Sequence, residues 1–145
     1  MIVATAAQRG VIPPAIDPES AAWWEAVGRG VLTLPRCRAN GHDFFPPAPA
    51  CPYCGGVGYD LHEASGRGQI YSWVVTHRAL DPRFKDDVPY TVLVVELEEG
   101  PRMFGRLVGP STFEPSADDA VRAVFYEVAG QPLVGFAPEA PPASA

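Results

Sequence analysis

The chain has 145 residues, 47% of them hydrophobic and only 19% charged, which is enough to bury a core in one domain or in two small ones. Its net charge is −6, and residues 63–145 carry seven basic and twelve acidic side chains, which counts against binding to a phosphate backbone. Its 17 prolines and 14 glycines predict many turns and short strands instead of long helices.

The sequence also bears on the compartment in which the protein works. No stretch approaches the roughly 18 apolar residues that a membrane span needs. Residues 1–10 have neither the basic start nor the long apolar run of a signal peptide. The three cysteines are an odd number, and two of them are separated by only two residues, which does not fit a disulfide framework. We therefore expect a cytoplasmic protein with reduced thiols that binds neither membranes nor nucleic acid.

Residues 1–30 are predicted to form an arm followed by a helix. The run 11–16 is apolar and rich in proline, and it fits either a disordered leader or an extended arm that docks on a partner. A helix is expected over residues 17–29, because Asp17 suits the N-cap and Pro18 suits the first helical position. Two glycines near residue 29 are expected to end it.

Two adjacent tryptophans, Trp23 and Trp24, lie on the predicted helix. Successive positions of a helix point in different directions, so both side chains cannot face one small core. Either both are core and boundary residues, or one of them covers the surface of a partner.

Residues 31–62 are predicted to form a zinc ribbon. Cys51 and Cys54, followed by a glycine, make a complete turn of the type that places two sulfurs on one metal ion. The upstream turn after Cys37 is incomplete, since Asn40 stands where a second cysteine is expected, and His42 is the obvious replacement. The four predicted ligands of a structural Zn²⁺, one per chain, are Cys37, His42, Cys51 and Cys54. A ribbon that has lost its metal and a redox-active dithiol remain as alternatives.

From residue 63 the pattern changes to short strands separated by turns. Strands are expected at residues 68–79, 90–97, 102–108, 121–128 and 133–136. Short strands of this number, with glycine and proline in the turns, predict a small barrel or sandwich over residues 63–137, followed by a flexible tail at 138–145. The expected fold class is therefore mainly β, with an N-terminal helix, a zinc ribbon and a barrel.

The order of these parts resembles a known family. The motifs that carry the resemblance are Trp23-Trp24-Glu25, Leu32-Thr33-Leu34-Pro35-Arg36-Cys37, Phe45-Pro46-Pro47, Cys51-Pro52-Tyr53-Cys54-Gly55, Ser65-Gly66-Arg67-Gly68-Gln69-Ile70-Tyr71-Ser72 and Val88-Pro89-Tyr90. Together they are similar to the thiolase-associated OB-fold proteins with an N-terminal rubredoxin-like zinc ribbon, over roughly residues 19–136. The resemblance implies that residues 63–137 form a five-stranded, OB-like barrel. The chain departs from that family at Asn40, where many members have a cysteine, so the family's four-cysteine site is in doubt here.

The resemblance implies a partner. Members of the family assemble with thiolase-like proteins that act on CoA esters, and a similar domain pairs with a thiolase-like subunit in a retro-aldolase of steroid side-chain degradation. In that arrangement the catalytic residues lie on the thiolase-like subunit. The resemblance therefore implies a non-catalytic accessory subunit of an aldolase or thiolase complex, with the CoA ester bound at or near the interface.

The residues themselves also argue against catalysis by this chain alone. His62 falls where the ribbon joins the barrel, and His77 falls at the end of a strand, where histidines are commonly solvated. No cysteine is left as a nucleophile if three bind zinc. The aromatic residues Tyr71, Trp73 and Tyr90 are able to stack on bases, but the acidic barrel lacks the basic groove that single-strand binding needs.

The segment 78–89 contains basic residues, among them Arg78, Arg83 and Lys85, which fit contacts with CoA phosphates or with the partner. Three aspartates lie among them, so a salt-bridged surface loop is the alternative. Two functions therefore remain in view. The first is an accessory subunit of a thiolase-like acyl-CoA enzyme, and the second is an independent acyl-CoA-binding or regulatory module.

Overall fold

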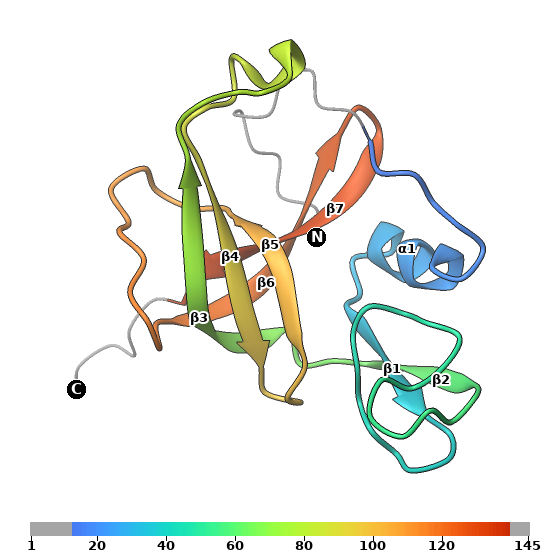
Figure 1. Ribbon diagram of the computed structural model, residues 1–145. Helices are drawn as coiled ribbons and strands as arrows, with labels where there is room; N and C mark the ends of the chain where they lie inside the picture. Colours follow the sequence, from blue (N-terminus) through green and yellow to red (C-terminus); the bar gives the residue numbers. More distant parts are fainter. Residues whose placement is uncertain (1–12, 140–145) are drawn as a thin grey trace.

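A computed structural model describes residues 13–139, in which a helix and a two-stranded ribbon lie beside a five-stranded barrel (Figure 1). The elements, in chain order, are α1 Ala21–Gly28, β1 Thr33–Cys37, β2 Tyr59–Glu63, β3 Arg67–Thr76, a 3-10 helix η1 Pro82–Phe84, β4 Tyr90–Leu97, β5 Arg102–Leu107, β6 Ala120–Val128 and β7 Gln131–Pro138. The predictions for the arm and the tail fall largely on residues outside the described range.

Helix α1 is shorter than the predicted span of 17–29, because Asp17 closes a turn that precedes it. The Asp17 carboxylate accepts the backbone N–H of Ser20 at 2.7 Å and the Ser20 hydroxyl at 2.8 Å, and Ser20 itself stands at the N-cap. At the other end, Gly30 adopts a φ of 73°, which lets the chain leave the helix without steric strain. Among residues 13–139, no helix is long and apolar enough to cross a membrane.

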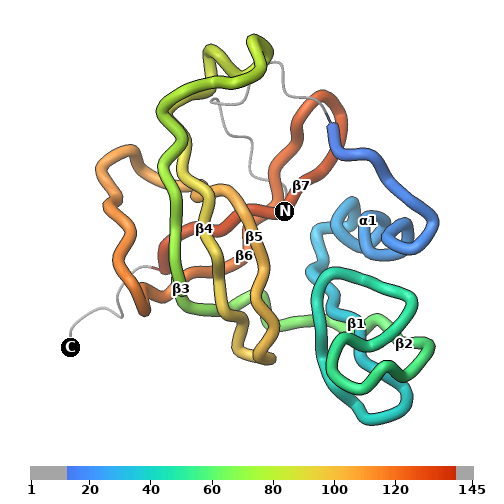
Figure 2. Tube along the Cα trace, viewed as in Figure 1, coloured from blue at the N-terminus to red at the C-terminus, as the bar shows by residue number. Residues whose placement is uncertain are grey.

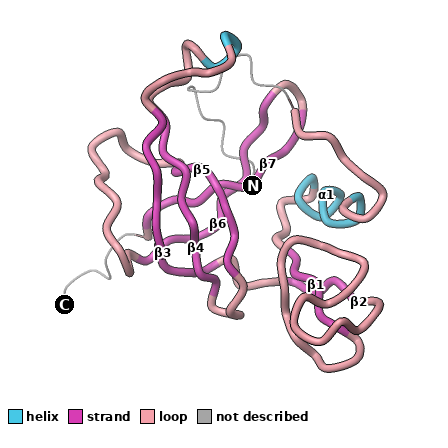
Figure 3. The backbone as a smooth tube through the Cα atoms, viewed as in Figure 1, coloured by secondary structure: helices cyan, strands magenta, loops and turns pink. Residues whose placement is uncertain are grey.

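The ribbon is built on β1 and β2, which pair antiparallel from Thr33 opposite Glu63 to Cys37 opposite Tyr59. Strand β1 begins at Thr33 and ends at Cys37, the first of the predicted metal ligands. The second strand was not predicted, because the segment Tyr59–Glu63 is mostly polar. Long loops join the two strands and form most of the outer part of the ribbon (Figure 3).

The barrel closes in the strand order β3-β4-β5-β7-β6, and all neighbours are antiparallel except β5 and β7. The prediction of a mainly β fold with a five-stranded, OB-like barrel is therefore confirmed. A register shift between Ile70 and Ser72 places a bulge at Tyr71, and such bulges bend a strand and increase its twist. The β3–β4 connection with η1 stands at the top of Figure 2, on the side away from the ribbon.

A single hydrophobic core links the three parts of the chain. Buried residues of the helix and the ribbon, including Trp23, Val27 and Leu34, pack in the same cluster as Ile70 and Phe136 of the barrel. A smaller cluster of Cys37, Phe44 and Cys51 lies within the ribbon. Because this second cluster has so few apolar members, burial alone provides little stability to the outer ribbon.

Candidate metal centre and partner surface

The first metal-binding turn of the ribbon follows Cys37 at the end of β1. The backbone N–H of Gly41 donates to the carbonyl of Cys37 at 2.8 Å, and the N–H of Cys37 donates to the carbonyl of His42, also at 2.8 Å. Gly41 has a φ of 68°, so the turn uses the left-handed conformation that glycine adopts most readily.

The second turn repeats this geometry around Cys51. The N–H of Gly55 donates to the carbonyl of Cys51 at 2.9 Å, and the N–H of Cys51 donates to the carbonyl of Gly56 at 2.9 Å. Gly55 has a φ of 71°. The two turns are therefore equivalent position by position, so Asn40 corresponds to Cys54 and His42 corresponds to Gly56.

The side chains of both turns converge. The Sγ atoms of Cys37, Cys51 and Cys54 all lie within 4.8 Å of one another. The Sγ atoms of Cys37 and Cys54 are 3.6 Å apart, and Nδ1 of His42 lies 3.6 Å from Sγ of Cys51. Two sulfurs on a tetrahedral zinc ion are about 3.8 Å apart, because each Zn–S bond is about 2.3 Å. The spacing of the three sulfurs thus fits a tetrahedral metal ion. Among the described residues, the donors that all lie within 4.8 Å of one another are these three sulfurs, and His42 lies beside them through its contact with Cys51.

Gly56 has no side chain, and this leaves room for the sulfurs of the two neighbouring cysteines. A Cβ atom added at Gly56 would lie 2.8 Å from Cβ of Ala39 and 3.3 Å from the sulfurs of Cys37 and Cys54. Its backbone N–H also points to Sγ of Cys54 at 3.4 Å. A larger residue at position 56 would therefore push into the donor set.

The three thiols differ in their electrostatic environment. A hydrogen bond from the Asn40 side chain, followed by the N–H of Gly56, lowers the pKa of the Cys54 thiol to about 6. Burial raises the pKa of the Cys51 thiol. The lowered pKa favours the thiolate form of Cys54, which is the form that binds metal. Asn40, which replaces the expected cysteine, still contacts the site through this hydrogen bond.

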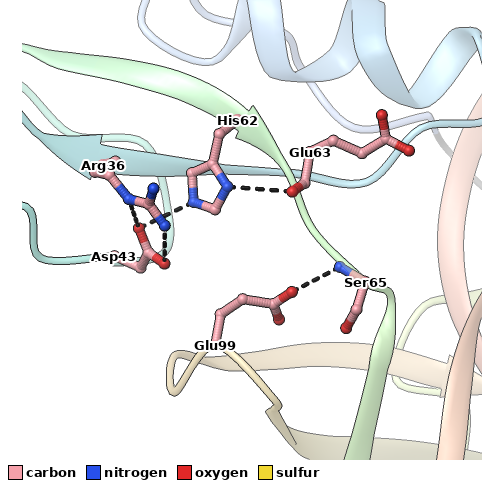
Figure 4. A network of polar contacts seen from close by, with 6 residues as sticks. All are labelled: Arg36, Asp43, His62, Glu63, Ser65 and Glu99. Carbon is pink, nitrogen blue, oxygen red and sulfur yellow. Dashed lines mark hydrogen bonds and ion pairs between the residues drawn. The ribbon is translucent and has the colours of Figure 1, made fainter.

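A polar network ties the first turn to β2 and to the barrel (Figure 4). Arg36 and Asp43 form a bidentate pair, with Nε–Oδ1 at 2.7 Å and the second contact at 3.0 Å, and Arg36 is the main cause of the lowered pKa of the Asp43 carboxyl. Nε2 of His62 lies 2.9 Å from Oδ1 of Asp43. Beyond β2, the N–H of Ser65 donates to Glu99 in the β4–β5 turn at 2.6 Å. The network therefore holds the ribbon and the linker in fixed positions.

The structure separates the two tryptophans of the predicted partner surface. Trp23 is only 5% exposed, and its Nε1–H donates to the carbonyl of Thr33 at 3.0 Å. Trp24 is half-buried and packs edge-on against Trp23 at a ring distance of 4.8 Å. Trp23 is a core residue that links α1 to β1. Both tryptophans line an apolar cavity of about 300 Å³, together with Phe45, Val92 and Phe104.

The predicted basic residues of the β3–β4 connection fall into two groups. Arg83 binds Asp81 at 2.5 Å, which makes Asp81 both its ion-pair partner and the cap of η1. Arg78 and Lys85 are exposed, and neither forms an ion pair with any residue between 13 and 139. Below the loop, Asp87 pairs with Arg106, whose guanidinium lies 3.8 Å from the ring centroid of Tyr90. These three residues line a cavity of about 430 Å³ at this end of the barrel, together with His77 and Phe113.

The outer face of β3, β4 and β5 was not recognised in the sequence as a surface. Cross-strand register places Ser72, Val94 and Phe104 in one row, and Val74, Val92 and Arg106 in the next. Phe104 is 71% exposed, Val74 is 57% exposed and Tyr71, beside them, is 53% exposed. We call this the outer apolar face. Its strands are rich in apolar residues on both sides, so the sequence alone does not distinguish this exposed face from the buried one.

Two protein-family models match the chain, one over the ribbon and one over the barrel. The model of the ChsH2 rubredoxin-like zinc ribbon domain matches residues 24–59, and that of the ChsH2 C-terminal OB-fold domain matches residues 61–126. A solved structure described as the Ltp2-ChsH2(DUF35) aldolase contains a chain that is 37% identical, with a TM-score of 0.76 over 86% of this chain and 98% of that one. The protein belongs to the ChsH2/DUF35 family. The predicted family resemblance is thereby confirmed.

Some curated relatives are matched over most of their own length, and others over less than half of it. A DUF35 domain-containing scaffold protein of Methanothermobacter thermautotrophicus is 38% identical over 73% of this chain and 80% of its own. A probable enoyl-CoA hydratase alpha subunit of Thermomonospora curvata is 44% identical over 66% of this chain. The 3-oxo-4,17-pregnadiene-20-carboxyl-CoA hydratase alpha subunit of Mycobacterium tuberculosis is 32% identical over 87%. This chain spans only 30% and 40% of those two subunits.

Proposed function

We propose that this chain is a non-catalytic accessory subunit that binds and supports a thiolase-like acyl-CoA enzyme. The enzyme is a retro-aldolase of steroid side chains, which cleaves a C–C bond of a β-hydroxyacyl-CoA, or a thiolase complex. The main support is the similarity to nearly the full length of the ChsH2 chain in a solved aldolase. A relative named as a scaffold protein and another named for a steroid CoA substrate support the same role.

The outer apolar face supports the presence of a protein partner. Its most exposed member, Phe104, is 71% exposed, and Val74 and Tyr71 are more than half exposed. Adjacent rows of apolar side chains on three strands form a continuous patch, and such patches on soluble proteins mark interaction sites. Both arginines at its edge are already paired, Arg102 with Glu96 and Arg106 with Asp87, so the patch favours an apolar partner surface.

A zinc ion bound by Cys37, Cys51, Cys54 and His42 has a structural role in this proposal. The donor spacing and the low pKa of Cys54 support metal binding, although a metal other than zinc would meet the same donors. Four protein ligands leave no open position for a reacting water, which is the arrangement of structural zinc sites. The ion would stiffen the outer ribbon, whose own apolar cluster is small.

The second candidate function is an independent acyl-CoA-binding module. One observation favours it, namely that Arg78 and Lys85 are exposed near the cavity of about 430 Å³ and form no ion pair among the described residues. Two such cations would attract the phosphates of CoA. The same residues also fit a CoA path at the interface with a partner.

One experiment separates the two functions. The purified chain is mixed with the Ltp2 component of the solved aldolase and analysed by size-exclusion chromatography with light scattering, and CoA binding to each component is measured by calorimetry. We expect a stable complex, no turnover by the chain alone, and C–C cleavage of a β-hydroxyacyl-CoA only by the mixture. Tight binding of CoA by the isolated chain without complex formation would instead support the independent module.

A further inference from the structure

Strand β3 has an edge that no other strand of the described residues 13–139 covers. Its pairing with β6 extends only over Arg67–Gln69, and two further backbone bonds join Ile70 to residues 118 and 119. From Ser72 to Thr76 the strand pairs with β4 alone. On the side away from β4, these five residues form no backbone hydrogen bond with any residue in the described range 13–139. We call residues 72–76 the free edge.

The bulge at Tyr71 explains why the edge is open. The register of β3 shifts between Ile70 and Ser72, which bends the strand away from β6 as it rises towards η1 (Figure 1). In an antiparallel pair, alternate backbone groups point away from the neighbour, so part of the N–H and C=O groups of residues 72–76 face outwards. These groups are available to a further strand.

The three central side chains of the free edge are apolar and cover both of its faces. Trp73 is 41% exposed, Val74 is 57% exposed and Val75 is 39% exposed. Opposite residues of an antiparallel pair share a face, so Val74 lies with Val92 on the outer apolar face, and Trp73 lies with Leu93 on the other. The segment contains none of the lysines, prolines or inward charges with which exposed edges are normally protected.

These observations point to an extended segment as the ligand. We propose that a segment of the thiolase-like partner adds to the free edge of β3 as a further antiparallel or parallel strand, with apolar side chains at alternate positions. The inference rests on the proposed function and specifies how the partner is recognised. Main-chain bonds along residues 72–76 provide the pairing, and contacts with Trp73, Val74 and Val75 provide selectivity.

A second copy of this chain fits the surface less well. Strand pairing between two copies would cover the free edge but not Phe104, which lies two strands away on β5 and therefore about 10 Å from it. Two copies also carry a net charge of −6 each and repel one another. A partner segment with a carboxylate near the end of β3 is complementary to Arg78, which is exposed and forms no ion pair among the described residues.

The test combines charge substitution with hydrogen exchange. Val74→Lys and Val75→Lys place a charge on either face of the free edge, and Val57→Lys makes the same change at a ribbon valine that is 82% exposed. Binding to the Ltp2 component of the solved aldolase is measured by calorimetry. We expect both edge variants to lose roughly 30-fold or more in affinity while Val57→Lys changes it by less than about threefold.

Amide exchange of the wild-type chain, with and without Ltp2, does not depend on any variant remaining folded. We expect the outward-facing amides among residues 72–76, which are not bonded to β4, to exchange roughly tenfold or more slowly in the complex. A complex that forms with unchanged exchange at these outward-facing amides, or with unchanged affinity in both edge variants, would overturn this inference and leave the proposed function intact. Protection of the outward-facing amides in the free chain would also overturn it, since a terminal segment or a second copy would then cover the edge. Absence of any complex would overturn the proposed function and this inference together.

Discussion

Asn40 occupies in the first metal-binding turn the position that Cys54 occupies in the second. The same pair of backbone hydrogen bonds defines both turns, and the Asn40 side chain is the main cause of the low pKa of the Cys54 thiol. The first turn therefore has the geometry of the second, but it carries a hydrogen-bond donor where the second carries a thiol. His42, at the position equivalent to Gly56, has its Nδ1 at 3.6 Å from the sulfur of Cys51 and is the candidate for the fourth ligand.

The first prediction concerns this division of roles. We expect His42→Ala to weaken zinc binding by roughly 100-fold, because a ligand is lost, and Asn40→Ala by about tenfold, because only a supporting hydrogen bond is lost. Asn40→Cys in the His42→Ala background should recover most of the affinity, since the turn already has the correct geometry. Competition with a chromophoric chelator gives the affinities, and the Co²⁺ absorption spectrum reports the number of thiolates. An unchanged affinity in His42→Ala would exclude His42 as a ligand.

The second prediction concerns removal of the metal. We expect chelation to abolish hydrogen-exchange protection of the hydrogen-bonded amides in the two metal-binding turns while leaving buried barrel amides, such as those of Leu93 and Val95, protected. The reason is that the cluster of Cys37, Phe44 and Cys51 is too small to order the outer ribbon alone. Re-addition of zinc to the same sample serves as the control. Uniform loss of protection across the barrel would instead show that the ribbon and barrel unfold as one unit.

Local patterns in the sequence predicted the parts of the structure that depend on neighbouring residues. The apolar run of β4 gave a strand with the bounds Tyr90–Leu97, and the spacing of the cysteines brought three sulfurs together. Strand β2 could not be recognised, because Tyr59–Glu63 has no apolar run and depends on pairing with β1. The contact between Asp43 and His62 joins residues 19 positions apart, which no local pattern encodes.

The sequence did not show which of the apolar side chains are exposed and which are buried. Residues 73–75 were predicted only as part of a strand; their side chains are exposed, because pairing with β6 stops at Gln69. Trp23 is the opposite case. It is one of the predicted partner residues, yet its side chain is buried and donates a hydrogen bond to the carbonyl of Thr33. In both cases the outcome depends on where a distant strand ends or begins, and that is a matter of tertiary structure.

The third prediction concerns the bond between Trp23 and the Thr33 carbonyl. We expect Trp23→Phe to reduce the free energy of unfolding by about 1–3 kcal/mol, because it leaves a buried carbonyl without its donor. Trp24→Phe is the matched control and should cost less, since Trp24 is only half-buried. Urea denaturation followed by far-UV circular dichroism measures both. Equal losses in the two variants would show that ring volume, and not the hydrogen bond, accounts for the effect.

The fourth prediction concerns the close approach of β5 to β7. A Cβ atom at Gly105 would lie 2.6 Å from the ring of Phe136, which is fully buried and cannot move freely. We expect Gly105→Ala to destabilise the fold by about 1–3 kcal/mol through overpacking. Gly28→Ala is the control, because nothing lies within 4 Å of its added Cβ, and it should stabilise the protein by about 0.4–1 kcal/mol. Thermal denaturation of both variants checks the opposite signs, and a stabilised Gly105→Ala would contradict the packing described here.

The fifth prediction concerns the basic residues of the β3–β4 connection. Asp81 already pairs with Arg83, and the hydrogen bond from Arg83 lowers the pKa of the Asp81 carboxyl to about 2. Arg78 and Lys85 have no such partner among the described residues, so they are the cations available to a phosphate or a carboxylate. We therefore expect Arg78→Glu and Lys85→Glu each to weaken the complex with Ltp2, or its affinity for a CoA ester, by roughly 5–30-fold at low salt.

Arg83→Glu is the matched control for that comparison and should have a smaller effect on binding, since it removes a cation that is already paired. The losses at Arg78 and Lys85 should shrink as the salt concentration rises from about 0.05 to 0.5 M, because exposed charges are screened beyond a few ångströms at high ionic strength. Calorimetric titrations at three salt concentrations would measure this dependence. A larger loss in Arg83→Glu than in Lys85→Glu would mean that the Asp81–Arg83 pair opens on binding, and that the ordered loop around η1 is remodelled by the partner.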